Sequence, residues 1–126
     1  MNRLVLPILL AIVVAAAVTL ATGLLPVRSG APPRTVVLSM RNYAFNDSNP
    51  TFAFEPGERV RFVVRNDEDT PVRHNFMIEG LAAPAEKDLL PGETREVIVT
   101  LPRSGEFTYS CGTHSGMGGR LVVRRR

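Results

Sequence analysis

Residues 109–119 read YSCGTHSGMGG, a stretch that places the thiol of Cys111, the imidazole of His114 and the thioether of Met117 within seven residues. Apolar and polar residues alternate over residues 106–111, a pattern typical of a strand with one buried and one solvent-facing side. Cys111 ends this predicted strand on its apolar side. The glycines that follow allow the backbone to turn tightly, so the three side chains can converge on one point.

The chain contains one other histidine, His74, at the start of a second predicted strand that reads HNFMI over residues 74–78. Phe76 shares the parity of His74 along this strand, so the imidazole is expected to face the core. Met77 has the opposite parity. We therefore expect Met117, and not Met77, to supply the thioether that joins the two histidines.

Taken one at a time, these residues indicate little, because a lone cysteine is usually a small buried apolar residue. Together they are informative, since the only cysteine and both histidines of the chain fall into one ligand pattern. Two imidazoles, a thiolate and a weak axial thioether define the blue-copper electron-transfer site. Structural zinc, in contrast, prefers sets of cysteine and histidine without methionine.

This donor set suits an electron carrier because its ligands accommodate both oxidation states of copper. Soft sulfur ligands favour Cu(I), whereas imidazole also suits Cu(II). A frame that holds all four donors near one intermediate geometry needs little rearrangement when an electron arrives or leaves. No coordination position is left open for a substrate, so the sequence predicts a carrier and not an enzyme.

The chain from Thr35 onward shows further short runs of alternating residues, separated by turn sequences such as EPGE at residues 55–58 and LPGE at residues 90–93. Short strands with frequent turns indicate an all-β sandwich or barrel. No segment after residue 35 has convincing helical spacing, although residues 81–90 could hold one short turn.

The stretch His74-Asn75-Phe76 and the loop from Cys111 to Met117 resemble the cupredoxin family, which includes plastocyanin, azurin, pseudoazurin and amicyanin. The short spacing of the loop is similar to that of the amicyanin type, and the resemblance covers roughly residues 35–124. It implies an all-β Greek-key sandwich, one type 1 copper ion and electron shuttling between redox proteins outside the cytoplasm.

The resemblance also implies roles for individual residues. It makes His74, Cys111, His114 and Met117 the copper ligands and gives Asn75 the role of joining the two ligand-bearing segments through hydrogen bonds. In the family, the histidine that matches His114 reaches the surface in an apolar patch, so His114 is the expected route for the electron. We expect the rim of this patch to include Leu81, Pro84 and Leu89.

One residue departs from many relatives with this spacing, which have proline directly before the second histidine where this chain has Thr113. Threonine keeps a backbone N–H that proline lacks. If this N–H points at the Cys111 sulfur, it withdraws electron density from the thiolate and disfavours Cu(II). The hypothesis is that the reduction potential exceeds that of a Thr113→Pro variant, which voltammetry can test.

The N-terminal segment, residues 1–27, is predicted to be a membrane anchor. Its 24 residues from Leu4 to Val27 carry no charge, and as a helix they would extend about 36 Å, more than the roughly 30 Å of a hydrocarbon core. The run is longer than the apolar core of most signal peptides, although the small residues at 21–23 leave signal cleavage and a secreted or periplasmic product open. Residues 28–34 form the expected linker to an exported domain at residues 35–126.

The charge distribution argues against a nucleic-acid partner. From residue 31 onward the chain has thirteen basic and twelve acidic residues, a net charge of only +1, which is too small to form a basic face that follows phosphates. We interpret the acidic run at residues 67–69 as a solvated loop and residues 124–126 as a basic end. A single cysteine excludes an internal disulfide, and a monomer is expected.

Two alternative functions follow from the same residues. Copper storage, delivery or resistance predicts an open, methionine-rich site, whereas Met117 is the only well-placed methionine. A copper enzyme such as nitrite reductase needs a second copper and more histidines than the two in this chain. In an enzyme complex, the chain would act as an electron-donating subunit.

Overall fold

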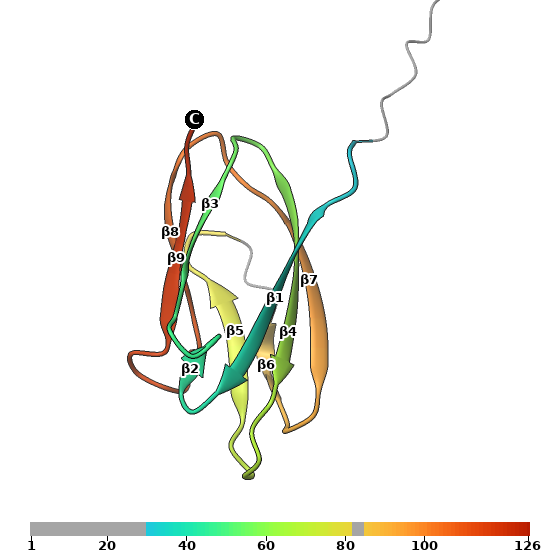
Figure 1. Ribbon diagram of the computed structural model, residues 1–126, viewed down its shortest axis with the longest axis vertical. Helices are drawn as coiled ribbons and strands as arrows, with labels where there is room; N and C mark the ends of the chain where they lie inside the picture. Colours follow the sequence, from blue (N-terminus) through green and yellow to red (C-terminus); the bar gives the residue numbers. More distant parts are fainter. Residues whose placement is uncertain (1–29, 82–84) are drawn as a thin grey trace, which may run out of the picture. The chain divides into compact units, whose positions relative to one another are not determined.

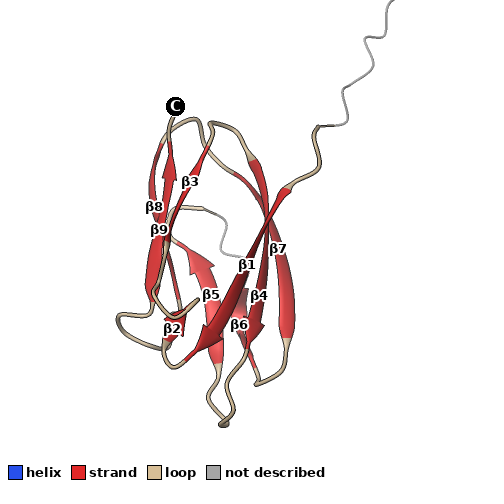
Figure 2. Ribbon diagram, in the orientation of Figure 1, coloured by secondary structure: helices blue, strands red, loops and turns tan. Residues whose placement is uncertain are grey.

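Strands formed by the alternating runs make up the fold in the computed structural model, which describes residues 30–81 and 85–126 (Figures 1 and 2). The strands belong to one unit, Ala31–Arg126. They are β1 (Arg34–Arg41), β2 (Ala44–Phe45), β3 (Thr51–Phe54), β4 (Arg59–Asn66), β5 (His74–Ile78), β6 (Ala85–Leu89), β7 (Thr94–Thr100), β8 (Gly105–Ser110) and β9 (Gly118–Val123).

These strands form two sheets, with the orders β2-β1-β4-β7 and β3-β9-β8-β5-β6 (Figure 1). β1 pairs with β4 in parallel, as β3 does with β9, and the remaining pairs are antiparallel. The chain passes repeatedly from one sheet to the other, and the apolar faces of both sheets meet in a common core. The prediction of an all-β sandwich is confirmed.

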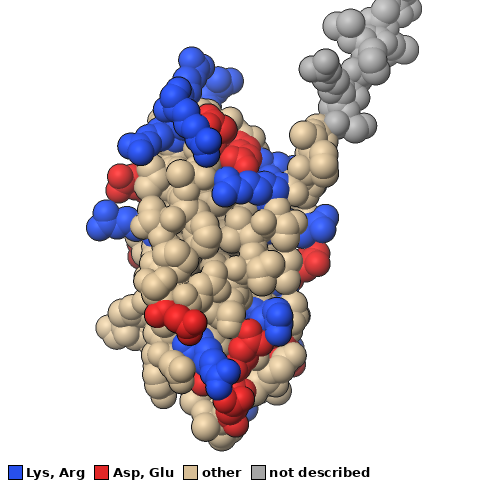
Figure 3. Space-filling view, viewed as in Figure 1, with Lys and Arg blue, Asp and Glu red and all other residues tan. Residues whose placement is uncertain are grey.

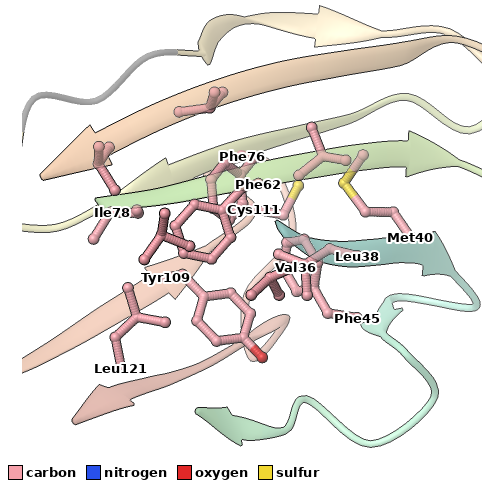
Figure 4. Packing of buried hydrophobic residues seen from close by; sticks show 14 of the residues in the cluster. Val36, Leu38, Met40, Phe45, Phe62, Phe76, Ile78, Tyr109, Cys111 and Leu121 are labelled. Carbon is pink, nitrogen blue, oxygen red and sulfur yellow. The ribbon is translucent and has the colours of Figure 1, made fainter. Parts of the chain in front are cut away.

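The core contains a cluster of four aromatic rings, with Phe76 at its centre. The centroid of the Phe76 ring lies 5.4 Å from that of Phe62, 6.1 Å from that of Phe45 and 6.2 Å from that of Tyr109. Figure 4 shows these side chains between the strands of the two sheets. Aliphatic residues from the inward positions of β1, β4 and β7 surround the rings: Val36, Leu38, Met40, Val60, Val64, Val97 and Val99.

Tyr109 fastens the loop before β3 to the core. Its hydroxyl donates a 2.6 Å hydrogen bond to the carbonyl oxygen of Pro50, and burial raises the pKa of Tyr109 to about 12, so the phenol stays protonated and keeps its donor. Gly119 of β9 faces this bond. A Cβ at this position would overlap both the Tyr109 hydroxyl and the Pro50 carbonyl, so only glycine fits here.

The sandwich has two distinct ends. β1 begins at Arg34 and β9 finishes at Val123 at one end, whereas the loop that joins β8 to β9 and the start of β5 lie at the other (Figure 1). The residues predicted to bind metal therefore lie together at the end of the sandwich opposite to the start of β1 and the end of β9.

Residues 81–90 differ from the sequence interpretation in two ways. The short helical turn that this segment could hold is not found at residues 85–89, because Ala85–Leu89 form β6, an edge strand beside β5. The expected apolar rim is also not formed as proposed: Leu89 is fully buried opposite His74, and Leu81 packs against the core beyond the far end of β5. Pro84 lies outside the described residues.

The predicted anchor, residues 1–27, also lies outside the described residues. Within residues 30–81 and 85–126, the structure contains no helix of the length and apolar character that a membrane span requires.

Candidate metal centre

Three segments of the five-stranded sheet deliver the predicted ligands to one end of the sandwich. His74 is the first residue of β5, and Cys111 directly follows the last residue of β8. His114 and Met117 lie in the loop from Ser110 to Gly118 that joins β8 to β9. His74, Cys111 and Met117 are buried, whereas His114 is only half-buried.

Three of these side chains form a compact triangle of donor atoms. The Nδ1 atoms of His74 and His114 are 3.1 Å apart, and the Cys111 Sγ lies 3.4 Å from the His114 Nδ1 and 3.9 Å from the His74 Nδ1. The point equidistant from the three atoms lies about 2 Å from each, which matches metal–nitrogen bonds of roughly 2.0–2.1 Å and metal–thiolate bonds of about 2.3 Å. The triangle therefore has the dimensions of a metal site.

Backbone hydrogen bonds within the loop hold Met117 close to Cys111 and His114. The Cys111 N–H donates to the Met117 carbonyl oxygen at 3.0 Å, and the Met117 N–H donates to the His114 carbonyl oxygen at 3.3 Å. These bonds close the loop into a tight turn, and a surface pocket is lined by Cys111, His114 and Met117 together. Met77, the alternative thioether, lies against Gly112. Met117 as the fourth ligand stays a prediction.

Asn75 makes the hydrogen bonds expected of a residue that joins β5 to the ligand loop. Its Oδ1 accepts a 2.6 Å hydrogen bond from the Gly112 N–H, and its Nδ2 donates to Asp88 Oδ1 at 3.2 Å. Its backbone N–H also points to the Cys111 sulfur, at 3.4 Å. One buried residue thus holds both the loop that carries three of the predicted ligands and the sulfur itself.

We expect Asn75→Ala to weaken copper binding about 10–100-fold, the usual effect of removing a partner that orients a metal ligand. The change deletes the acceptor for Gly112 and leaves the loop free to move. Competition with a chelator of known affinity measures the loss. Asp88→Asn is the matched control, because it keeps the bond between Asn75 and Gly112. Equal affinities of Asn75→Ala and the parent would contradict this role.

Thr113 reaches the sulfur by a different route from the one predicted. Its hydroxyl oxygen lies 3.2 Å from the Cys111 Sγ and 3.3 Å from the His114 Nδ1. Among the described residues, the backbone N–H directed at the sulfur is that of Asn75 and not that of Thr113. The Thr113 hydroxyl, and not its backbone N–H, is therefore placed to withdraw electron density from the thiolate, and the higher potential relative to Thr113→Pro stays a prediction.

Glu68 was missed by the sequence analysis. The side chain of Glu68 is only 7% exposed, and its Oε1 lies 2.8 Å from the His74 Nε2. The interpretation of residues 67–69 as a solvated loop is thus wrong for the middle residue. Its neighbours do face outward, where Asp67 pairs with Arg65 and Asp69 pairs with Arg41.

Tyr43 was also missed. Its ring meets the His114 ring edge-on, with centroids 4.9 Å apart and planes at 75°, and lies 6.2 Å from the His74 ring. Tyr43 is 55% exposed as a residue, so an aromatic surface lies directly beside His114, the more accessible of the two donor histidines. Tyr43 occupies a turn between β1 and β2 with a φ of 59°, a conformation that alternation patterns do not reveal.

A small two-sheet sandwich with a histidine–cysteine–histidine cluster at one end defines a β-sandwich metalloprotein. The chain belongs to the cupredoxin family: it matches the family model described as cupredoxin-like domain over residues 9–123. No curated protein sequence matches the chain significantly.

Solved structures share this fold. The chain is 22% identical to auracyanin B, covering 75% of this chain and 91% of that one, with a TM-score of 0.60. Its identity to the dithionite-reduced auracyanin of Roseiflexus castenholzii is 19%, with coverage of 75% and 100% and the same TM-score. A copper-containing nitrite reductase of Thermus scotoductus SA-01 is 23% identical with a TM-score of 0.61, but this chain covers only 29% of it. At these identities the likeness establishes a common fold, and the expected closeness to amicyanin stays a prediction.

The donor chemistry fits one type 1 copper ion. One nitrogen each of His74 and His114 and the sulfur of Cys111 all lie within 4.8 Å of one another. Met117, which carries a thioether, lies at the end of the loop that also carries Cys111 and His114. This trigonal His₂Cys set with methionine is the arrangement of blue copper, and the family is the one that holds such ions. Copper is the cofactor of this protein.

Proposed function

We propose that the protein is a single-electron carrier that uses one type 1 copper ion held by His74, Cys111, His114 and Met117. The observation that carries the proposal is the donor triangle, whose sides of 3.1, 3.4 and 3.9 Å are already set by the strands and the loop. Copper supplies a one-electron couple at this point. The chain keeps the donors nearly fixed in both states, which keeps the barrier to transfer low.

The electron is proposed to pass through His114. His74 is buried within the sandwich, whereas the His114 ring reaches the surface beside Tyr43. A redox partner that docks over these two rings comes within close range of the metal without disturbing the buried ligands. Gly116, which has no side chain to obstruct contact, lies in the same loop.

The partner is proposed to recognise a surface of mixed charge. Figure 3 shows basic side chains gathered near the C-terminal end of the sandwich and a mixture of both signs at the opposite end. Part of the basic end is paired, since Arg126 lies 3.3 Å from Glu55. A mixed surface around the metal centre favours a partner recognised mainly by its shape and apolar contacts, and it does not favour nucleic acid.

The proposed location is the outer face of a membrane, with residues 1–27 as the anchor and the domain as a monomer in the periplasm or outside the cell. The uncharged run of 24 residues supports an anchor. The start of β1 at the end opposite to the metal centre supports it too, because the point of attachment is then distant from His114. Cleavage within the segment would instead release a soluble carrier.

The test is to add Cu(II) to residues 31–126, which form one unit with their own core. We expect one equivalent of copper to give an intense blue colour that disappears on reduction and returns on oxidation. Stopped-flow mixing with a small cytochrome should then show electron exchange. A pale product whose copper is easily removed by a weak chelator would favour storage or delivery instead.

An independent enzymatic role is not supported. The similar nitrite reductase is far longer than this chain, which covers 29% of it, and this sequence has no histidines beyond the two in the cluster. A second catalytic copper would need further imidazole ligands. The chain is therefore proposed to donate or accept electrons for an enzyme, and not to be one.

A further inference from the structure

Glu68 makes a buried polar contact with His74, one of the predicted copper ligands. The Glu68 Oε1 lies 2.8 Å from the His74 Nε2, and the exposed fractions of the two side chains are 7% and 0%. Of the three acidic residues in this loop, Asp67 and Asp69 have arginine partners. Among the described residues, the carboxylate of Glu68 contacts the imidazole instead, so its charge is directed at the metal centre.

The contact fixes which nitrogen of His74 carries the proton. A carboxylate can only accept a hydrogen bond, and a neutral imidazole has one N–H. The proton must therefore sit on Nε2, which leaves the lone pair of Nδ1 directed at the Cys111 Sγ and the His114 Nδ1. This is the arrangement in which a carboxylate orients a metal-binding histidine and makes it a stronger electron donor.

The same contact acts on the redox equilibrium. The metal centre carries one more positive charge in the oxidised than in the reduced state, and a nearby negative charge stabilises the more positive state. Solvent screens such an interaction at the surface but much less in the interior. A carboxylate that is 7% exposed should hence favour Cu(II) far more than the exposed Asp69, one residue further along.

We propose that Glu68 is a positioning residue of the copper centre, one that keeps His74 in its Nε2-protonated form and lowers the reduction potential. The inference rests on the proposed function and assigns to Glu68 a part in setting the reduction potential of the copper centre. It assigns a role to a carboxylate whose sequence context, an acidic run, indicates only a solvated loop.

The first experiment is Glu68→Gln in the full chain loaded with copper. Glutamine has the same shape, and its amide oxygen can accept the bond from Nε2, so the geometry is kept while the charge is lost. We expect the ratio of Cu(I) to Cu(II), at equilibrium with a fixed reference couple, to rise at least tenfold, which is 59 mV for one electron.

Asp69→Asn is the matched control, because it removes the same charge from a side chain that is 76% exposed. Its ratio should change less than twofold. Equal shifts in the two variants, or a fall in the ratio for Glu68→Gln, would overturn the proposed effect on the potential.

The second experiment uses the copper-free chain and does not depend on the proposed function. Nitrogen-15 NMR of the His74 ring should report a protonated Nε2 and an unprotonated Nδ1 in the parent and in Glu68→Gln. In Glu68→Ala, which has no acceptor, we expect a mixture of both forms. A single unchanged form in Glu68→Ala would refute the positioning role. Failure of the chain to form a blue copper site would contradict the proposed function. The NMR result would still show whether Glu68 positions the proton of His74.

Discussion

A Cys111→Ser variant is expected to lose the intense visible absorption of the copper-loaded protein almost completely. The colour arises from charge transfer from thiolate to copper, and a serine hydroxyl is neither soft nor ionised at neutral pH. Copper binding should also weaken. Removing a residue that only orients a ligand costs about 10–100-fold in affinity, and loss of the sulfur itself is expected to cost more.

Absorption spectra of the two proteins, each with one equivalent of Cu(II), measure this effect. Ser115→Ala serves as the control, since Ser115 is an exposed residue of the same loop, and it should stay blue. Circular dichroism of the copper-free variants shows whether the sandwich is retained. An intensely blue Cys111→Ser protein would mean that the sulfur is not a ligand.

The second large effect is expected in the core, where Phe76→Ala should lower the free energy of unfolding by about 3–5 kcal/mol. The ring is fully buried and contacts Phe45, Phe62 and Tyr109, so its removal leaves a cavity among these rings. Phe76 also lies two residues from His74 on the same strand. A loosened β5 is therefore expected to weaken copper binding as well.

Denaturant unfolding of copper-free residues 31–126 gives the free energy directly. The control is Ile98→Ala on β7, because Ile98 is 46% exposed and surface substitutions usually change stability by less than about 0.5 kcal/mol. Comparable losses in the two variants would show that the aromatic cluster is not the centre of the core.

Alternation of apolar and polar residues predicted those strands that have one buried face and one solvent-exposed face. β1, β4, β7, β8 and β9 all show this alternation in their exposed and buried residues. β6 was missed because it is an edge strand with the polar sequence AEKDL, and polar, charged residues are common on edges. β2, with two residues, is too short for any period to appear.

The candidate site was predictable to the extent that its chemistry is local. Cys111, His114 and Met117 are close in sequence, and the parity of His74 along β5 gave its direction. Glu68 and Tyr43 were not predictable, because both lie in loops where no period fixes the direction of a side chain. Glu68 is surrounded by acidic residues that do face water, so composition suggested the opposite of its burial.

The separation of the C-terminus from the metal centre determines where the protein can be coupled to an electrode or fused to a second protein. β9 finishes at the end of the sandwich opposite to the loop that joins β8 to β9 (Figure 1), so a peptide added after Val123 is attached at a point distant from the donor residues. A film on a gold electrode, coupled through a C-terminal tag, should thus present His114 to the solution. The same geometry suits fusion to a reductase, in which both proteins keep their exchange surfaces open.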